Sequence, residues 1–89
     1  MKESFLERAA RKLDIPADLA AGAPKIVIRG YRDIYIENHK GLLEYGTQEI
    51  HIDAGDATLK LTGEGFHIRA MAAGELRLEG LLFKVEFVF

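Results

Sequence analysis

The chain has 89 residues, of which 48% are apolar, so it is long enough for one domain with a modest core and too apolar to be disordered. Its formal net charge of −2, with no basic run longer than two residues, argues against nucleic acid as the main partner. It contains no cysteine, which excludes disulfides and thiolate zinc sites, and it shows no signal-peptide core or bilayer-length apolar stretch. We therefore expect a soluble cytoplasmic protein with no direct membrane insertion.

The first 23 residues are predicted to form a helical cap on the rest of a single domain, 1–89. Ser4 is a suitable N-cap, and Pro16 stops the helix because the residue before a proline avoids the helical region. Between them, apolar residues recur at helical spacing at Phe5, Leu6, Ala9, Ala10 and Leu13. We expect this helix to cover an open end or edge of a sheet.

From residue 24 onward the apolar period changes to two, which predicts a β-rich region over 24–89. Eight pairs of apolar residues each bracket one residue, and glycines lie between them. About eight short strands are expected, around Ile26/Ile28, Ile34/Ile36, Leu43/Tyr45, Ile50/Ile52, Leu59/Leu61, Phe66/Ile68, Leu76/Leu78 and Val85/Phe87.

Two architectures fit this pattern. Gly30, Gly46, Gly63 and Gly80 follow successive strands at intervals of 16, 17 and 17 residues, so the repeating unit is two strands and two turns. A short β-solenoid with 16–17-residue coils, capped by the helix, would satisfy the interval. The turn residues at 38–41, 53–55 and 72–74, however, are typical of compact hairpins, which join antiparallel strands. They favour an all-β antiparallel meander folded as a small sandwich or barrel, with the N-terminal α-helix beside it.

Residues 36–45, with the sequence Ile-Glu-Asn-His-Lys-Gly-Leu-Leu-Glu-Tyr, are the most informative stretch of the chain. Asn38 can bend its own backbone, and Gly41 can supply a positive φ at the end of a type I turn. The stretch thus predicts a hairpin whose flanking side chains share one face, namely Ile34, Ile36, Leu43 and Tyr45.

The same run is preceded by Pro24-Lys25-Ile26 and Gly30, and followed by apolar pairs that end in Val85-Glu86-Phe87. In this combination, which covers nearly the whole chain, it resembles the YabP/YqfC family of sporulation proteins. The resemblance implies a non-enzymatic structural or assembly factor of endospore formation, made in the mother cell and acting through protein contacts. It also implies a sporulation membrane protein as partner, and hence a peripheral position at the forespore envelope. It brings no catalytic or ligand-binding residue.

Two surfaces are predicted to contact a partner. One is the turn at Asn38, His39 and Lys40, because polar turn residues on a rigid scaffold are where binding concentrates. The other is the C-terminal strand, which is apolar on both faces and is therefore either central in a sheet or covered by something else. Here Val85 and Phe87 are expected to face the core, with Phe83 on the same side. The contact candidates Leu82 and Val88 would face away, and Phe89 follows, so that a homo-oligomer could bury the strand.

We expect no catalytic residue, no cofactor and no metal site. The histidines at positions 51 and 67 match no ligand spacing, and no serine or threonine has a histidine base in an evident motif. The alternative function is a small β-barrel binding module for nucleic acid or saccharide. Only Tyr31 and Tyr35 are candidates for stacking with its ligand.

Overall fold

The structure is a computed structural model that describes residues 23–89. This part of the chain is all β, as predicted, and its strands are all antiparallel. The helix predicted from Ser4 to Leu13 lies outside the described residues. The six strands are β1 Lys25–Arg29, β2 Asp33–Glu37, β3 Gly41–Tyr45, β4 Glu49–Asp53, β5 Thr58–Ala72 and β6 Glu75–Val88.

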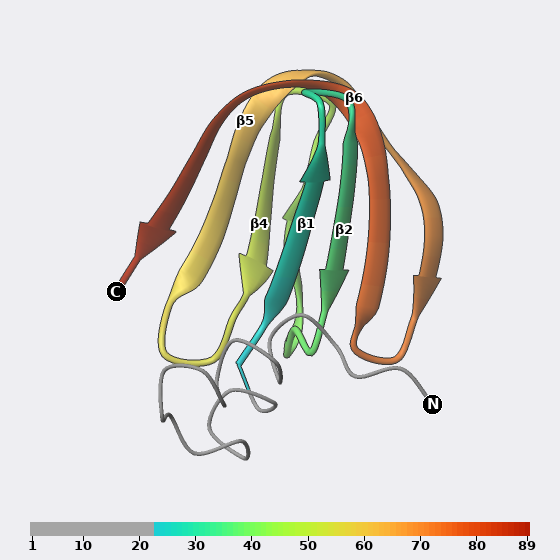
Figure 1. The fold of residues 1–89 in the computed structure, drawn as a ribbon. Coiled ribbons are helices and arrows are strands. Elements are labelled where there is room, and N and C mark those ends of the chain that lie inside the picture. The colour runs from blue at the N-terminus through green and yellow to red at the C-terminus, as the bar shows by residue number, and fades with distance from the viewer. Residues whose placement is uncertain (1–22) are drawn as a thin grey trace, which may run out of the picture.

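The strands form one sheet in the order β1-β2-β6-β5-β4-β3, which folds over on itself. Figure 1 shows the two long strands β5 and β6 arching over the top of the molecule, with the short strands beside their legs. Layer A contains β3, β4, the first half of β5 and the second half of β6. Layer B contains β1, β2, the first half of β6 and the second half of β5. The result is the small sandwich, not the closed barrel, because no strand joins β1 to β3 in the described sheet.

The core lies between the two layers. Each strand that contributes to it has alternating buried and open residues, which is the pattern of a sheet with one covered face. The fully buried side chains come from β2, β4 and the halves of β5 and β6 that flank them: Ile34, Ile36, Ile50, Ile52, Leu59, Leu61, Phe66, Leu76 and Leu78.

Glycines allow the long strands to bend around Phe66. A Cβ on Gly80 would lie 2.6 Å from Phe66 Cδ1, and a Cβ on Gly63 would lie 2.7 Å from Phe66 Cζ and overlap the Leu81 carbonyl oxygen. The β5–β6 register shifts between Thr62 and Gly63 and again shortly after, as expected where a strand pair bends through bulges. The aromatic ring can therefore fill the inside of the bend only because these two positions have no side chain.

The predicted count of eight strands is wrong for this reason. Glycines at 63, 65 and 80 were interpreted as turns between short strands, whereas they lie inside the long strands β5 and β6, where the chain bends without reversing. The solenoid is also wrong, because its coils would stack in parallel and every strand pair here is antiparallel. The meander is correct for β3-β4-β5-β6, while β1 and β2 form a hairpin that joins the sheet beside β6.

The predicted hairpin at residues 36–45 is wrong as well. Strand β2 pairs with β1 and β6, whereas β3 pairs with β4, so residues 38–40 carry the chain from layer B to layer A. As a consequence, the side chains flanking this segment do not share one environment. Ile34 and Ile36 are fully buried, but Leu43 and Tyr45 are 59% and 45% exposed. Leu43 is the residue skipped by the β3–β4 register, which places a bulge in this edge strand.

Candidate interaction surface

The C-terminal half of β6, Lys84–Val88, is an edge strand; we call it the β6 edge. One side pairs with Thr58–Thr62 of β5. On the other side, the β1–β2 turn accepts hydrogen bonds from the backbone amides of Gly80 and Leu82, at 3.1 and 2.8 Å. Beyond this turn, no described strand pairs with the β6 edge, and in Figure 1 it descends at the outer left of the molecule. Its outward backbone groups are therefore available to another strand.

The inner face of the β6 edge is apolar and only partly covered. Val85 pairs with Leu61 and Phe87 pairs with Leu59, so all four side chains point to the side of the core. The two leucines are fully buried, but Val85 is 37% and Phe87 47% exposed. The opposing layer therefore covers β5 and leaves the adjacent β6 edge open. The prediction that Val85 and Phe87 face the core side is correct in direction, but they are not buried.

Apolar exposure is concentrated at this edge. Val88, on the other face, is 48% exposed and Phe89 93%. The other free edges of the described sheet carry fewer exposed large apolar residues: Ile28 on β1, Leu43 and Tyr45 on β3, and Met71 on the second half of β5. Clustering of this kind marks contact surfaces, since single exposed apolar residues are common but contiguous ones are not.

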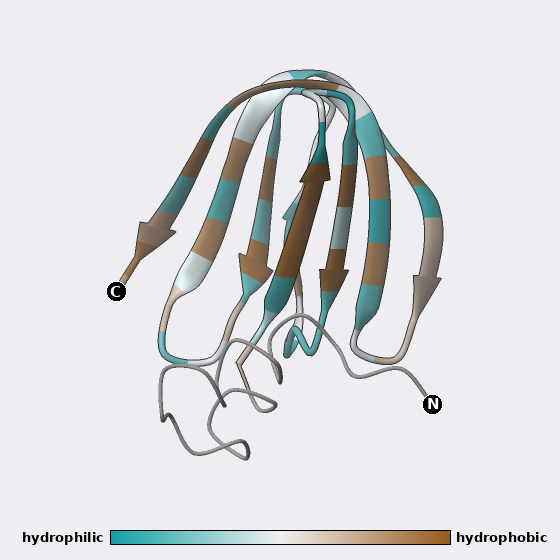
Figure 2. Ribbon diagram, in the orientation of Figure 1, coloured by the Kyte–Doolittle hydropathy of each residue, from teal (hydrophilic) through white to brown (hydrophobic). Residues whose placement is uncertain are grey.

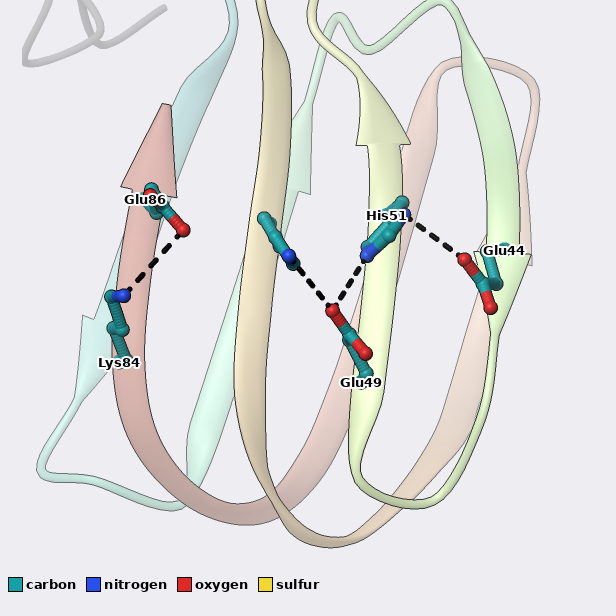
Figure 3. Close-up of polar contacts among 6 residues, drawn as sticks. Glu44, Glu49, His51, Lys84 and Glu86 are labelled. Carbon is teal, nitrogen blue, oxygen red and sulfur yellow. Dashed lines mark hydrogen bonds and ion pairs between the residues drawn. The ribbon is translucent and has the colours of Figure 1, made fainter. Parts of the chain in front are cut away.

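The outer face of layer A is charged (Figure 3). His51 lies between two carboxylates, with Nδ1 3.0 Å from Glu44 Oε2 and Nε2 3.0 Å from Glu49 Oε1. The Lys60 ammonium is 3.1 Å from the same Glu49 oxygen. Hydrogen bonds from His51 and Lys60 lower the pKa of the Glu49 carboxyl, and the hydrogen bond to Glu49 raises the pKa of Lys60.

This charged face continues onto the β6 edge. Lys84 Nζ lies 3.6 Å from Glu86 Oε1, and Figure 3 shows both side chains on the same side of the strand. Along Lys84–Phe87, charged outer residues thus alternate with apolar inner ones, and Figure 2 shows teal and brown bands along this end of the strand. The β6 edge therefore offers a partner strand charged side chains on one face, apolar side chains on the other, and backbone groups with which no described strand pairs.

The segment Asn38–Lys40 is held by local contacts. The His39 amide donates to the Gly74 carbonyl at 3.3 Å, and the Lys40 amide donates to the Asp53 carbonyl at 2.7 Å. The His39 ring has a role in the turn that the sequence did not suggest, because Nδ1 accepts a hydrogen bond from the Gly41 amide at 3.0 Å. Asn38 has a φ of 62° and Gly41 a φ of 151°, so the predicted positive φ at Gly41 is correct although the type I turn is not.

The two predicted contact surfaces lie at the same end of layer A. Gly41 pairs with Asp53, Asp53 with Thr58, and Thr58 with Val88, which puts residues 38–40 about 14 Å from the end of the β6 edge at ~4.8 Å per strand. Asn38 and Lys40 are exposed and His39 is half-buried. Leu82, in contrast, packs against the core, because the register shift between Gly63 and Thr62 turns it inward. The prediction that Leu82 faces outward is wrong.

A second polar group lies at the bend, on the outside of layer B. His67 Nε2 and Arg69 Nε are 3.3 and 3.4 Å from Glu79 Oε2, beside a depression that Arg32, Asp33 and Glu64 also line. Within residues 23–89, no group of three or more histidine, aspartate or glutamate side chains is arranged to hold a metal ion. The same residues include no helix with the length and hydrophobicity needed to cross a membrane.

Comparisons with known proteins identify the family. A sequence model for the YabP family matches residues 20–88. The chain is 36% identical over 78 residues to a Bacillus subtilis (strain 168) protein named "Uncharacterized protein YqfC", covering 88% of this chain and 84% of that protein. No solved structure matches. Since both the family match and this relative span most of the chain, the protein belongs to the YabP/YqfC family.

Proposed function

We propose that this protein is a non-enzymatic assembly factor of endospore formation that acts by binding proteins. The observation that carries the proposal is the β6 edge. Within residues 23–89 no strand pairs with its outward backbone groups, and the side chains of Val85, Phe87 and Val88 on it are exposed. Strand addition at such an edge derives affinity from main-chain hydrogen bonds and specificity from alternate side chains. Family membership supplies the link to sporulation.

In this proposal the protein works in the mother cell, at the cytoplasmic side of the forespore envelope. A sporulation membrane protein recruits it, and the end of the sandwich at Asn38–Lys40 is the second surface available for that contact. Exposed Asn38 and Lys40 side chains on a connection held by backbone hydrogen bonds to Gly74 and Asp53 suit such a role.

The experiment is sporulation of a strain whose only copy of the gene encodes Phe87→Asp. A carboxylate at this position should block an apolar contact while leaving the fold intact, because Phe87 is already 47% exposed. The matched control is Leu43→Asp, on the other edge strand of the same layer and 59% exposed. We expect heat-resistant spores to fall with Phe87→Asp and not with Leu43→Asp, at equal protein levels. Equal sporulation of the two strains would contradict the proposal.

The binding module for nucleic acid or saccharide is less well supported by the structure. The sheet is open in its described part, and the charged row beside the aromatic residues alternates Lys84 with Glu86 instead of forming a basic track. Retention of the purified protein on a column of single-stranded nucleic acid at low salt would favour that alternative.

A further inference from the structure

One histidine connects the edge strand of layer A to the rest of the layer. His51 of β4 pairs with Glu44 of β3 on one side and with Lys60 of β5 on the other. Its Nδ1 lies 3.0 Å from Glu44 Oε2, and its Nε2 lies 3.0 Å from Glu49 Oε1. Figure 3 shows the ring lying between the two carboxylates. The contact between His51 and Glu44 therefore joins β3 to β4 through side chains.

This arrangement depends on the protonation state of the ring. A neutral imidazole has one N–H and one lone pair, so only one of its nitrogens can donate a hydrogen bond to a carboxylate. Because both nitrogens of His51 lie 3.0 Å from a carboxylate oxygen, a neutral ring would direct a lone pair at one of the two anions. The imidazolium donates from both nitrogens and carries a charge that both carboxylates attract. Both contacts are therefore satisfied together only when the ring is protonated.

The neighbouring strands surround the ring with charged groups. Glu44 and Glu49 contact it directly, whereas the ammonium of Lys60 contacts Glu49 at 3.1 Å. Glutamate carboxyls are ionised well below the ordinary histidine value of about 6.5, so both anions are present over the range in which an imidazole titrates. The charged side chains of the described strands on this face are Glu44, Glu49, Asp53, Lys60 and, on β6, Lys84 and Glu86.

Strand β3 has few other contacts with the described part of the sandwich. It is paired on one side only, and a bulge at Leu43 interrupts its register with β4. Leu43 and Tyr45 are exposed, while Leu42 packs against the core and the Tyr45 hydroxyl donates to the Phe66 carbonyl at 3.2 Å. A strand with little buried apolar surface separates from its sheet at a low cost in free energy. A side-chain contact of modest strength can therefore change how often β3 opens.

We propose that His51 is a pH-dependent switch, which holds β3 against β4 when its ring is protonated and releases β3 when the ring is neutral. A proton bound preferentially by the closed strand stabilises that strand below the ordinary histidine value, and this contribution is lost as pH rises above it. When β3 separates, the outward backbone groups of Glu49–Asp53 become available to a different strand. The switch is independent of the β6 edge, on which the proposed function rests.

The test is hydrogen exchange of the backbone amides of β3 beyond the bulge, in the full chain, at about pH 6 and about pH 8. Each rate is corrected for the intrinsic exchange rate of an unstructured peptide. In the wild type, protection of these amides should fall about two- to fivefold between the two pH values, as expected for the loss of an exposed ion pair. The amides of β1, an edge strand that contains no histidine, are the internal control and should keep their protection.

His39 has the opposite dependence on pH and determines which amides are compared. Its Nδ1 accepts a hydrogen bond from the Gly41 amide, which it can do only while that nitrogen is unprotonated. Titration of His39 would therefore increase protection at the start of β3 as pH rises. A fall beyond the bulge at Leu43 has the sign expected for His51 and not for His39.

Two substitutions remove the switch in different ways. His51→Gln keeps a polar side chain that takes up no proton in this range, and Glu44→Gln keeps the ring but removes the carboxylate on β3. The Glu44 side chain is 61% exposed, so its replacement leaves the fold intact. In both variants, protection beyond the bulge should no longer fall between pH 6 and pH 8. His67→Gln, which removes a histidine 3.3 Å from Glu79 on layer B, is the matched control and should retain the fall.

A wild type whose β3 protection is equal at the two pH values, or rises, would overturn the inference. So would a fall that persists in either His51→Gln or Glu44→Gln, or one that disappears in His67→Gln, because each result assigns the dependence to another group. A parallel fall in β1 would also overturn it, since the whole domain, and not β3, would then respond to pH.

Discussion

Gly63→Ala is predicted to be among the most damaging single-methyl additions in the described domain. The new Cβ would overlap the Leu81 carbonyl oxygen and lie 2.7 Å from Cζ of Phe66. Neither neighbour can yield easily, because Phe66 is only 1% exposed within the core and Leu81 pairs with Glu64 in the β5–β6 ladder. The methyl group can be accommodated only by opening the bend.

The magnitude follows from these contacts. Overpacking of a filled core costs about 1 to 3 kcal/mol, and each ladder hydrogen bond lost at the bend adds about 1 kcal/mol, so we expect about 3 to 5 kcal/mol. Domains have only ~5 to 15 kcal/mol of stability in total. At roughly 4 to 8 °C per kcal/mol for a domain of this size, the melting temperature should fall by at least about 12 °C.

The assay is thermal unfolding followed by circular dichroism, with Gly30→Ala as the matched control. Gly30 has a φ of 63° and nothing within 4 Å of an added Cβ, so alanine there should cost only the left-handed backbone strain, about 1 to 2 kcal/mol. Equal melting temperatures for Gly63→Ala and Gly30→Ala would refute the reasoning, because the bend would then not depend on the missing side chain.

Three further predictions concern the connection at 38–41 and the charged face. Gly41→Val should lower stability by about 1 to 3 kcal/mol in a thermal melt, since a β-branched residue is strained at a φ of 151°; an unchanged melting temperature would contradict this. His39→Ala should cost about 1 kcal/mol in urea unfolding by removing the acceptor of the Gly41 amide, and an equal effect of His67→Ala, whose ring lies at the bend, would count against that specific role. The pKa of Glu49 is lowered in the folded state, so its contribution to stability is present above its ordinary value of 4.5 and disappears as pH falls through the folded value. Unfolding free energies of Glu49→Gln and wild type should therefore differ at neutral pH and converge in acid; a gap that widens in acid would reverse the assigned sign.

Within the described chain, local sequence patterns were sufficient to predict the features that depend on residues close together in the sequence. The period of two from Lys25 onward predicted an all-β antiparallel structure, because alternation reports which side of a strand is covered regardless of what covers it. The predicted connections at Asp53–Gly55 and Ala72–Gly74 are hairpins, since their turn residues act within a few positions: the Gly55 amide donates to the Asp53 carboxylate at 2.9 Å, and Gly74 has a φ of 73°.

The same local reasoning failed where the role of a residue depends on a contact with residues distant in the sequence. A glycine that bends a strand around Phe66 has the same sequence appearance as a glycine in a turn, so 63 and 80 could be distinguished from turns only by the ring packed against them. The connection at 38–40 contains turn residues, but the strands that it joins do not pair with each other: β2 pairs with β6, and β3 pairs with β4. Local chemistry cannot specify that choice.

The C-terminal strand shows most clearly what the sequence determines and what the tertiary structure determines. The sequence by itself determined that residues 81–89 are apolar on both faces and that Lys84 and Glu86 alternate with Val85 and Phe87. Whether this strand is central or at an edge depends on which other strands lie beside it. Lys84–Val88 pairs with β5 alone and is an edge, whereas Glu75–Glu79, which was predicted as a separate strand but belongs to the same β6, lies between β2 and β5. Only the tertiary structure could decide this, because the burial of a strand depends on which strands lie beside it and opposite it, and the bend in β5 and β6 sets that arrangement.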